Sequence, residues 1–200
     1  MDGESVLKGR SLFADRVGEQ VSAPALTLVD DPTDPDAYGA SQYDAEGLSS
    51  RRNLLIDGGV LQGFLYNTYA AKRAGTRSTA SAVRAGFKSG PGIGARALSL
   101  VPGSMTPEEI LRSVDTGLLV QSVSGVHSGV NPVSGDFSVG AEGMLFKGGV
   151  LAEPVREITI ASTLQRMLLA VVAIGSDLER LPSSAAGLTI AIDDVSMSGA

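Results

Sequence analysis

The sequence contains no cysteine, no tryptophan and a single histidine, His127. Without cysteine the chain can form neither a disulfide framework nor a thiolate metal site, and it has no cysteine nucleophile. One histidine is too few for the His-Glu-x-x-His helix of many zinc hydrolases. The sequence also lacks the Gly-x-Ser-x-Gly elbow of serine hydrolases. Most common catalytic arrangements are therefore missing, and no catalytic or metal-binding residue is predicted on this chain.

Long apolar runs and excess positive charge are absent as well. The longest apolar run, from Met167 to Ile174, is far shorter than the ~20 residues that cross a bilayer. The first seven residues have neither the basic nor the apolar region of a secretory signal. The formal net charge is −6, which argues against binding to nucleic acid or to an anionic membrane. We therefore predict a cytoplasmic protein with neither of these partners.

The residues that are present indicate a globular domain. Apolar residues make up 43% of the chain and aromatic residues only 4%, so the core must consist mainly of Leu, Val, Ile and Ala. Apolar runs between turn residues predict strands at 5–12, 20–29, 97–101, 118–123, 155–161 and 187–197. Capping residues predict helices at 69–74, from Thr106 to Gly117, and from the Ser162–Gln165 capping box to Ile174. The expected fold class is α+β, a mostly antiparallel sheet (barrel-like or sandwich) with about three helices.

Two short motifs could be mistaken for ligand sites. Residues 30–36 hold four aspartates, but prolines interrupt them and the Asp-x-Asp-x-Asp-Gly calcium loop is absent. We expect a solvated loop there. Residues 90–94, Gly-Pro-Gly-Ile-Gly, lack the Gly-Lys-Ser/Thr ending of a phosphate loop, so phosphate binding is disfavoured.

A mildly basic segment stands out in this acidic chain. It contains Arg77, Arg84, Lys88 and Arg96. Surface cations are usually just solvated, and that interpretation is favoured. Docking of an acidic peptide or of a partner is the alternative.

Glycine-rich sequence between Ser122 and Val155 carries the strongest motif. Glycines separate short apolar runs there, and Lys147-Gly148-Gly149 is a hairpin signal like Asp57-Gly58-Gly59 upstream. We expect a Gly-hinged antiparallel hairpin that lines a peptide groove. The candidate groove or partner contacts are Gly125, His127, Gly129, Asn131, Gly135 and Asp136.

Several motifs of this chain, in order, resemble one protein family. They include Gly129-Val130-Asn131-x-x-Ser134-Gly135-Asp136-Phe137-Ser138, Glu157-Ile158-Thr159-Ile160-Ala161, Asp44-x-Glu46-Gly47, Leu100-x-Pro102-Gly103 and Val195-Ser196-Met197-Ser198-Gly199. Together they resemble the C-terminal half of the TldD/PmbA metalloproteases. The segment 175–187 has no cysteine, which is similar to the PmbA (TldE-like) branch rather than to the TldD-like branch.

This resemblance implies that residues 1–200 form a TldD/PmbA-like C-terminal domain and that the family's N-terminal half is absent from this chain. It implies a subunit of a heterodimeric metalloprotease that acts on unfolded or precursor peptides. Zinc is expected on a TldD-like partner, bound by a His-Glu-x-x-x-His helix, and no cofactor is expected on this chain. The expected partners are a TldD-like zinc-binding subunit or a second copy, and an extended peptide substrate.

Two alternatives stay open at this stage. The chain could belong to an enzyme in its own right, with metal ligands in the half that is absent here. It could instead be a peptide-binding or inactive fragment with no activity of its own. Peptidase activity that needs both this chain and a TldD-like protein would separate the heterodimer from both alternatives.

Overall fold

The computed structural model describes residues 1–199, which divide into two compact units. The first unit contains Met1–Val101 and Leu178–Leu188, and the second contains Pro102–Asp177 and the chain from Thr189 onward. The chain therefore leaves the first unit, returns to it for a short segment and leaves it again.

A four-stranded antiparallel sheet forms the centre of the first unit. Its strand order is β3-β2-β1-β6, with β1 Leu28–Asp30, β2 Asn53–Asp57, β3 Val60–Leu61 and β6 Leu98–Leu100. The predicted hairpin at Gly58-Gly59 is confirmed, because β2 and β3 pair antiparallel with Asp57 opposite Val60. Fully buried Leu55, Ile56 and Leu61 make this hairpin the apolar centre of the unit.

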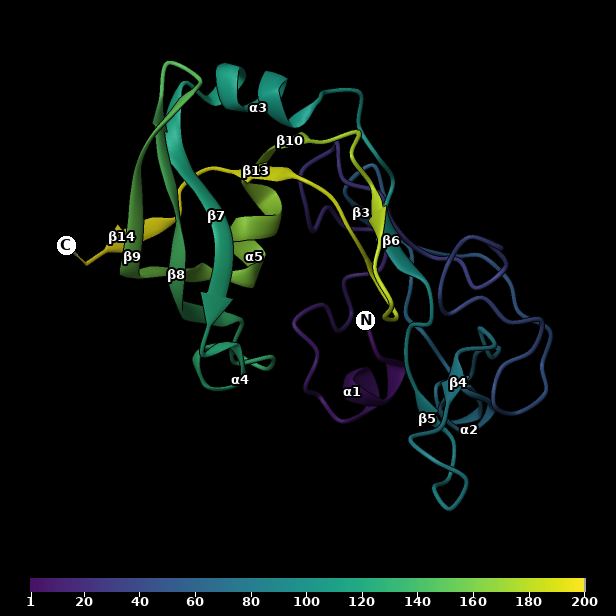
Figure 1. Cartoon of the computed structure of the whole chain (residues 1–200). Coiled ribbons are helices and arrows are strands. Elements are labelled where there is room, and N and C mark those ends of the chain that lie inside the picture. The colour runs from purple at the N-terminus through teal and green to yellow at the C-terminus, as the bar shows by residue number, and fades with distance from the viewer. Residues whose placement is uncertain (200) are drawn as a thin grey trace. The chain divides into compact units, whose positions relative to one another are not determined.

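Two short helices belong to the first unit (Figure 1). Helix α2, Thr68–Arg73, starts as predicted, because the Asn67 side chain accepts a hydrogen bond from the Ala70 amide. Helix α1, Gly3–Leu7, replaces the strand that we expected at 5–12. The Asp2 side chain caps α1 by accepting from the Glu4 amide. A run of only a few apolar residues is compatible with the periodicity of a strand and with that of a helix. Here the aspartate cap favours the helix.

Two small hairpins complete the first unit. In one, β4 Ala82–Val83 pairs with β5 Gly92–Ile93. In the other, β11 Glu179–Arg180 pairs with β12 Ala186–Gly187. The second hairpin is held to β6 by the Leu98 amide, which donates to the Ser184 carbonyl at 2.8 Å. A segment far away in the sequence thus covers the outer edge of the β6 strand.

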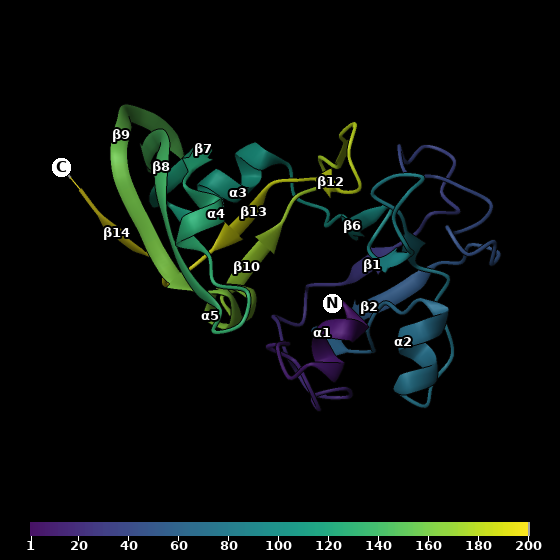
Figure 2. The same ribbon diagram turned by 90° about the horizontal axis from the view of Figure 1, so that it is seen from below.

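The second unit is built on a larger antiparallel sheet of strand order β14-β9-β8-β7 (Figure 2). The strands are β7 Thr116–Ser124, β8 Asp136–Lys147, β9 Val150–Thr163 and β14 Ser196–Ser198. The predicted turn at Gly148-Gly149 joins β8 to β9 and is confirmed. Val139, Ala141, Ile158 and Ile160 form the buried cluster on one face of this sheet.

Three helices and a small two-stranded sheet complete the second unit. The helices are α3 Pro107–Val114, α4 Val126–Gly129 and α5 Leu164–Leu169, and the strands are β10 Val171–Ile174 and β13 Ile190–Ile192. The capping box predicted at the start of α3 is present, with Thr106 and Glu109 bonded reciprocally.

Two predicted elements in the second unit are corrected. The helix expected to reach Ile174 ends at Leu169, because the next residues pair with β13 as strand β10. The β-branched Val171, Val172 and Ile174 favour that strand. The single strand expected at 187–197 is two strands, β13 and β14, which lie in different sheets. Asp194, with φ +55°, turns the chain between them.

All pairs between these strands are antiparallel, so the predicted α+β class with a mostly antiparallel sheet is confirmed. Residues 1–199 contain five helices rather than about three, and the additional ones, α1 and α4, are at most five residues long. None of the helices in this range is long and apolar enough to cross a bilayer.

We predict that Ile158→Ala destabilises the second unit. The side chain is 3% exposed in the buried cluster, so its truncation should cost about 2–5 kcal/mol of unfolding free energy. Urea denaturation followed by circular dichroism measures the change. The control is Val150→Ala at a position that is 68% exposed, which should change the free energy by less than about 0.5 kcal/mol. Equal effects of the two substitutions would contradict the assigned core.

Candidate functional site

The six predicted site residues all lie between the end of β7 and the start of β8. Gly125, with φ +75°, directly follows β7 and precedes the single turn of α4. Its carbonyl accepts from the Gly129 amide at 2.7 Å. The chain then passes through a tight turn at 131–135 and enters β8 at Asp136. The structure therefore brings the predicted residues together at one end of the large sheet.

Asn131, Gly135 and Asp136 build the tight turn. The Asn131 side chain accepts from the amides of Val133 and Ser134 at 2.9 and 3.2 Å. The Ser134 hydroxyl donates to the Asp136 carboxylate at 2.6 Å. Gly135 is buried and has φ +85°, a conformation that other residues adopt only under strain. The polar side chains of Asn131 and Asp136 and the positive φ of Gly135 thus stabilise the turn itself.

This turn is also joined to helix α5. The Gly135 carbonyl accepts from the Leu164 amide at 2.7 Å, and the Gln165 side chain donates to the Ser134 carbonyl at 3.2 Å. Gly129 lies equally close to its neighbour, since a Cβ there would be 1.9 Å from the Ser138 carbonyl oxygen. The motif that carries the family resemblance is therefore an anchoring motif for the β7–β8 connection.

His127 is different, because its side chain is exposed on α4. Within residues 1–199, no hydrogen bond or ion pair of its imidazole is present. A general base in a catalytic pair needs an orienting partner within hydrogen-bond reach, and none is provided by the described part of the chain. The geometry leaves His127 free to contact a bound molecule, and its role as a groove contact stays a prediction.

The free edge of β7 is a further candidate site, whose residues the sequence did not single out. β7 is the outer strand of the sheet and pairs only with β8 among the described residues. Its nine residues, Thr-Gly-Leu-Leu-Val-Gln-Ser-Val-Ser, include no charge and no proline. Edge strands are usually protected by lysine, proline or a covering segment, because their unpaired amides and carbonyls otherwise recruit another strand. Apart from a bulge near Val120, residues 1–199 provide no lysine, no proline and no further strand at this edge.

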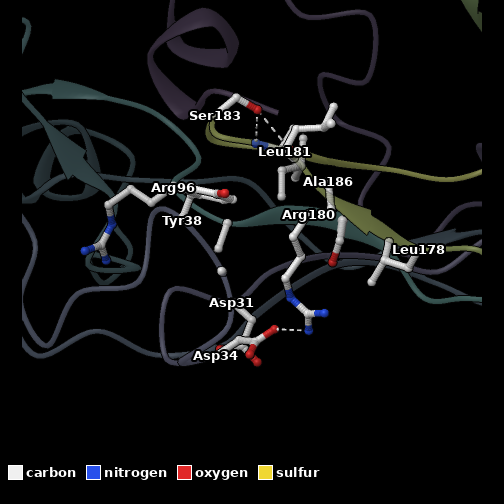
Figure 3. Close-up of a pocket in the computed structure, with 14 residues that line it drawn as sticks. Asp31, Asp34, Tyr38, Arg96, Leu178, Arg180, Leu181, Ser183 and Ala186 are labelled. Atoms are coloured by element: carbon white, nitrogen blue, oxygen red, sulfur yellow. Dashed lines mark hydrogen bonds and ion pairs between the residues drawn. The ribbon is translucent and has the colours of Figure 1, made fainter.

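A small pocket is one concave feature of the first unit (Figure 3). The loop at 31–38, Arg96 and the β11–β12 hairpin line it. Its volume is about 30 Å³, enough for one or two water molecules and far below the roughly 300 Å³ of a ligand pocket. We therefore do not regard it as a substrate site.

The predicted solvated loop lies beside this pocket, with Thr33, Pro35 and Asp36 exposed, but two of its aspartates make specific contacts with the fold. Asp30 is fully buried, and its Oδ1 accepts from the amides of Arg96 and Ala97 at 2.9 and 2.8 Å. The Arg180 guanidinium donates to the Asp34 carboxylate at 2.7 Å, as Figure 3 shows. This hydrogen bond holds the pKa of Asp34 below its usual value and raises the pKa of Arg180. The loop is a fixed support for the returning hairpin.

These residues do not fit a metal ion. In the range 1–199, no group of three or more His, Cys, Asp or Glu side chains could hold one. Asp30 Oδ1 is engaged with backbone amides and Asp34 with Arg180, and the lone histidine is far from them in the sequence and lies in the other unit. A zinc site needs three or four nitrogen, sulfur or carboxylate ligands around one point.

Comparison with known proteins identifies the family. The sequence profile of the PmbA/TldA metallopeptidase C-terminal domain matches residues 1–199. The chain belongs to this family. A Haemophilus influenzae relative named "Metalloprotease PmbA homolog" is 32% identical over 201 residues, covering 100% of this chain and 42% of the relative. The Escherichia coli O157:H7 protein named "Metalloprotease PmbA" is 30% identical, covering 88% of this chain and 37% of that protein.

A solved structure supports the same assignment. TldE from Thermococcus kodakarensis superposes with a TM-score of 0.92 at 29% sequence identity, covering 99% of this chain and 45% of that one. The predicted membership of the family, in its PmbA (TldE-like) branch, is confirmed. The chain spans about two-fifths of the length of the curated relatives it matches. The absence of an N-terminal half from this chain stays a prediction.

We predict that Gly129→Ala destabilises the β7–β8 connection. The added Cβ would collide with the backbone carbonyl of Ser138, so the change should cost about 1–3 kcal/mol of unfolding free energy. The control is Gly63→Ala, where a Cβ meets no atom within 4 Å and φ is ordinary. Urea denaturation of both variants measures the difference. A Gly129→Ala variant as stable as Gly63→Ala would show that the two backbones are not in close contact.

The ion pair at the pocket predicts a specific pH dependence. Because Arg180 lowers the pKa of Asp34, the pair stabilises the fold above the ordinary carboxylate pKa, and this contribution is lost as pH falls through the folded-state pKa. In Arg180→Gln, the pKa of Asp34 should rise toward its ordinary value. Carboxyl-directed NMR titration measures that pKa directly.

Denaturation at several pH values gives a second measurement of the same pair. The stability difference between the wild type and Arg180→Gln should be largest near neutral pH and vanish in acid. Arg156→Gln is the matched control, because Arg156 is exposed and forms no ion pair in the described chain. An unchanged Asp34 pKa in Arg180→Gln would contradict the pairing.

Proposed function

We propose that this chain is the C-terminal part of a subunit of a TldD/PmbA-type metalloprotease complex that acts on unfolded or precursor peptides. The free, uncharged edge of β7 is the observation that carries the proposal. Relatives of the chain are named metalloproteases, which supports a role in peptide hydrolysis.

The β7 edge binds the peptide as an additional strand. Each added residue pairs through backbone amides and carbonyls, so the peptide needs an extended conformation but little particular sequence. A folded protein has few such segments free, whereas an unfolded or precursor peptide has many. Strand addition therefore favours the binding of unfolded peptides over folded proteins and does not depend on particular side chains of the peptide.

The α4 turn forms the rim of this site. Gly125 follows the last residue of β7 directly, so a peptide paired along β7 passes the turn that carries exposed His127. The imidazole contacts the peptide there and takes no part in bond cleavage. The fixed turn at 131–135 holds this rim in place through its bonds to α5.

Zinc belongs to the partner in this proposal. The described residues of this chain supply no donor set for it. A relative from Buchnera aphidicola named "Metalloprotease TldD homolog" is 26% identical over 180 residues, which supports a pair of related subunits. We place the metal on a TldD-like subunit and peptide positioning on this one.

The substitution Val123→Lys tests the β7 edge. Val123 is 46% exposed on β7, and a lysine there opposes strand pairing while leaving the core intact. With a TldD-like partner, hydrolysis of a fluorogenic unfolded peptide should fall about tenfold, equivalent to 1.4 kcal/mol. Co-purification with the partner should be unaffected, which separates peptide binding from assembly.

The control is Val150→Lys, which places the same charge at an exposed position of β9 beside the hairpin turn. It should leave hydrolysis within about twofold of the wild type. Full activity of Val123→Lys would exclude the β7 edge as the peptide site. Peptidase activity of this chain without any partner would refute the division of roles.

A further inference from the structure

Positive charge is concentrated in one part of this acidic protein. Between Asp57 and Glu108 the sequence contains no aspartate or glutamate but six cations: Lys72, Arg73, Arg77, Arg84, Lys88 and Arg96. The whole chain, in contrast, has a formal net charge of −6. The net charge of this segment is therefore positive, whereas that of the whole chain is negative.

One of the six cations is engaged inside the fold. The Arg96 guanidinium donates to the carbonyls of Tyr43 and Ala80 at 3.0 and 2.9 Å, and to the Ser50 hydroxyl at 3.0 Å. The other five are exposed, and within residues 1–199 none of them lies in an ion pair. Their charges are uncompensated by the protein itself.

Two exposed aromatic rings accompany these cations. Phe87, in the loop of the β4–β5 hairpin, is 87% exposed, and Tyr69 on α2 is 64% exposed. The Lys88 ammonium lies 5.4 Å from the centre of the Phe87 ring, and the Arg73 guanidinium lies 5.7 Å from that of Tyr69. Each pair presents an apolar ring together with a cation.

The two pairs belong to neighbouring elements. The Asn67 side chain, which caps α2, also donates to the carbonyls of Pro91 and Gly92 at the start of β5. Figure 1 shows α2 beside the hairpin, with the hairpin loop extending away from the body of the unit. We call Tyr69, Lys72, Arg73, Arg77, Arg84, Phe87 and Lys88 the basic aromatic patch.

We propose that the basic aromatic patch binds acidic polypeptide segments that also carry apolar side chains. The cations attract carboxylates, and the rings of Phe87 and Tyr69 give apolar contact area at a low entropic cost. The patch belongs to the first unit and the proposed peptide edge on β7 to the second, so the two sites share no residue.

Charge also decides between a peptide and a nucleic acid. In physiological salt, the electrostatic interaction of an exposed charge extends only about 8 Å. A short acidic segment bound at the patch therefore interacts with the positive charges of the patch and not with the negative charges elsewhere on the protein. A long nucleic acid extends beyond the patch and meets the negative charge that dominates the rest of the protein. The observations therefore favour a short acidic peptide.

Fluorescence anisotropy tests the proposal with the full chain. The probe is a short fluorescein-labelled peptide of repeating Glu-Leu-Gly, and the comparison peptide replaces every Glu with Lys. We expect the acidic peptide to bind at low salt, binding to weaken as salt rises, and the lysine peptide not to bind. An oligothymidylate long enough to extend beyond the patch and anionic lipid vesicles are used as competitors, and neither should displace the acidic peptide.

Substitutions then locate the binding. Arg84→Glu combined with Lys88→Glu should weaken binding at least tenfold, and Phe87→Ala about fivefold, because hot-spot side chains contribute more than about 1 kcal/mol each. Lys147→Glu is the charge control on an exposed, unpaired cation of the second unit. Tyr43→Ala is the aromatic control at a residue that is 56% exposed. Both controls should stay within about twofold of the wild type.

Four outcomes would overturn the proposal. They are no measurable binding of the acidic peptide, equal binding of the lysine peptide, displacement by oligothymidylate or vesicles, and a Lys147→Glu effect as large as that of the double substitution. Because the substituted side chains are exposed, circular dichroism and thermal unfolding should be unchanged in all variants. Weaker binding together with unaltered folding would assign the effect to the patch.

Discussion

Pairing between β8 and β9 is the interaction on which the second unit depends. The register sets Val139 opposite Ile160 and Ala141 opposite Ile158, which places all four side chains in the buried cluster. Side chains alternate between the two faces of a strand, so a slip of one residue would turn this cluster outward. The same register sets Asp136 opposite Thr163, where the tight turn meets the start of α5. The candidate site is therefore positioned by a core that lies elsewhere in the sheet.

Much of the local structure could be predicted from the sequence. The hairpin at Gly148-Gly149 and the capping box at Thr106 depend on a few adjacent residues, and both are present. The predictions were wrong where contacts with residues distant in the sequence determine the secondary structure or the burial of a residue. Residues 171–174 are apolar enough for a helix but find β13 as a pairing partner, and buried Asp30 finds two backbone amides some 65 residues away in sequence. Single-sequence patterns do not contain such long-range contacts.

In the candidate site, too, the features that depend on adjacent residues could be predicted, and those that depend on distant residues could not. The glycine-rich motif was predicted to line a groove, and in the structure most of its residues shape the β7–β8 connection, while His127 is exposed there. The groove contacts stay a prediction. Which strand forms the free edge could not be predicted, because an edge is defined by strand order, which depends on the whole sheet. The basic segment was noticed from composition. That its cations are unpaired and accompanied by two exposed rings follows only from the three-dimensional arrangement.

The return of residues 178–188 to the first unit has a consequence for the order of folding. During synthesis residues 1–101 emerge before residues 178–188, yet the bridge between Leu98 and Ala185 that covers the edge of β6 needs both segments. The outer edge of β6 must stay open while residues 102–177 are translated. Unpaired edges of this kind attract other chains during folding. Forms of this chain that lack residues 178–188 should therefore expose the outer edge of β6 and aggregate more readily than the full chain.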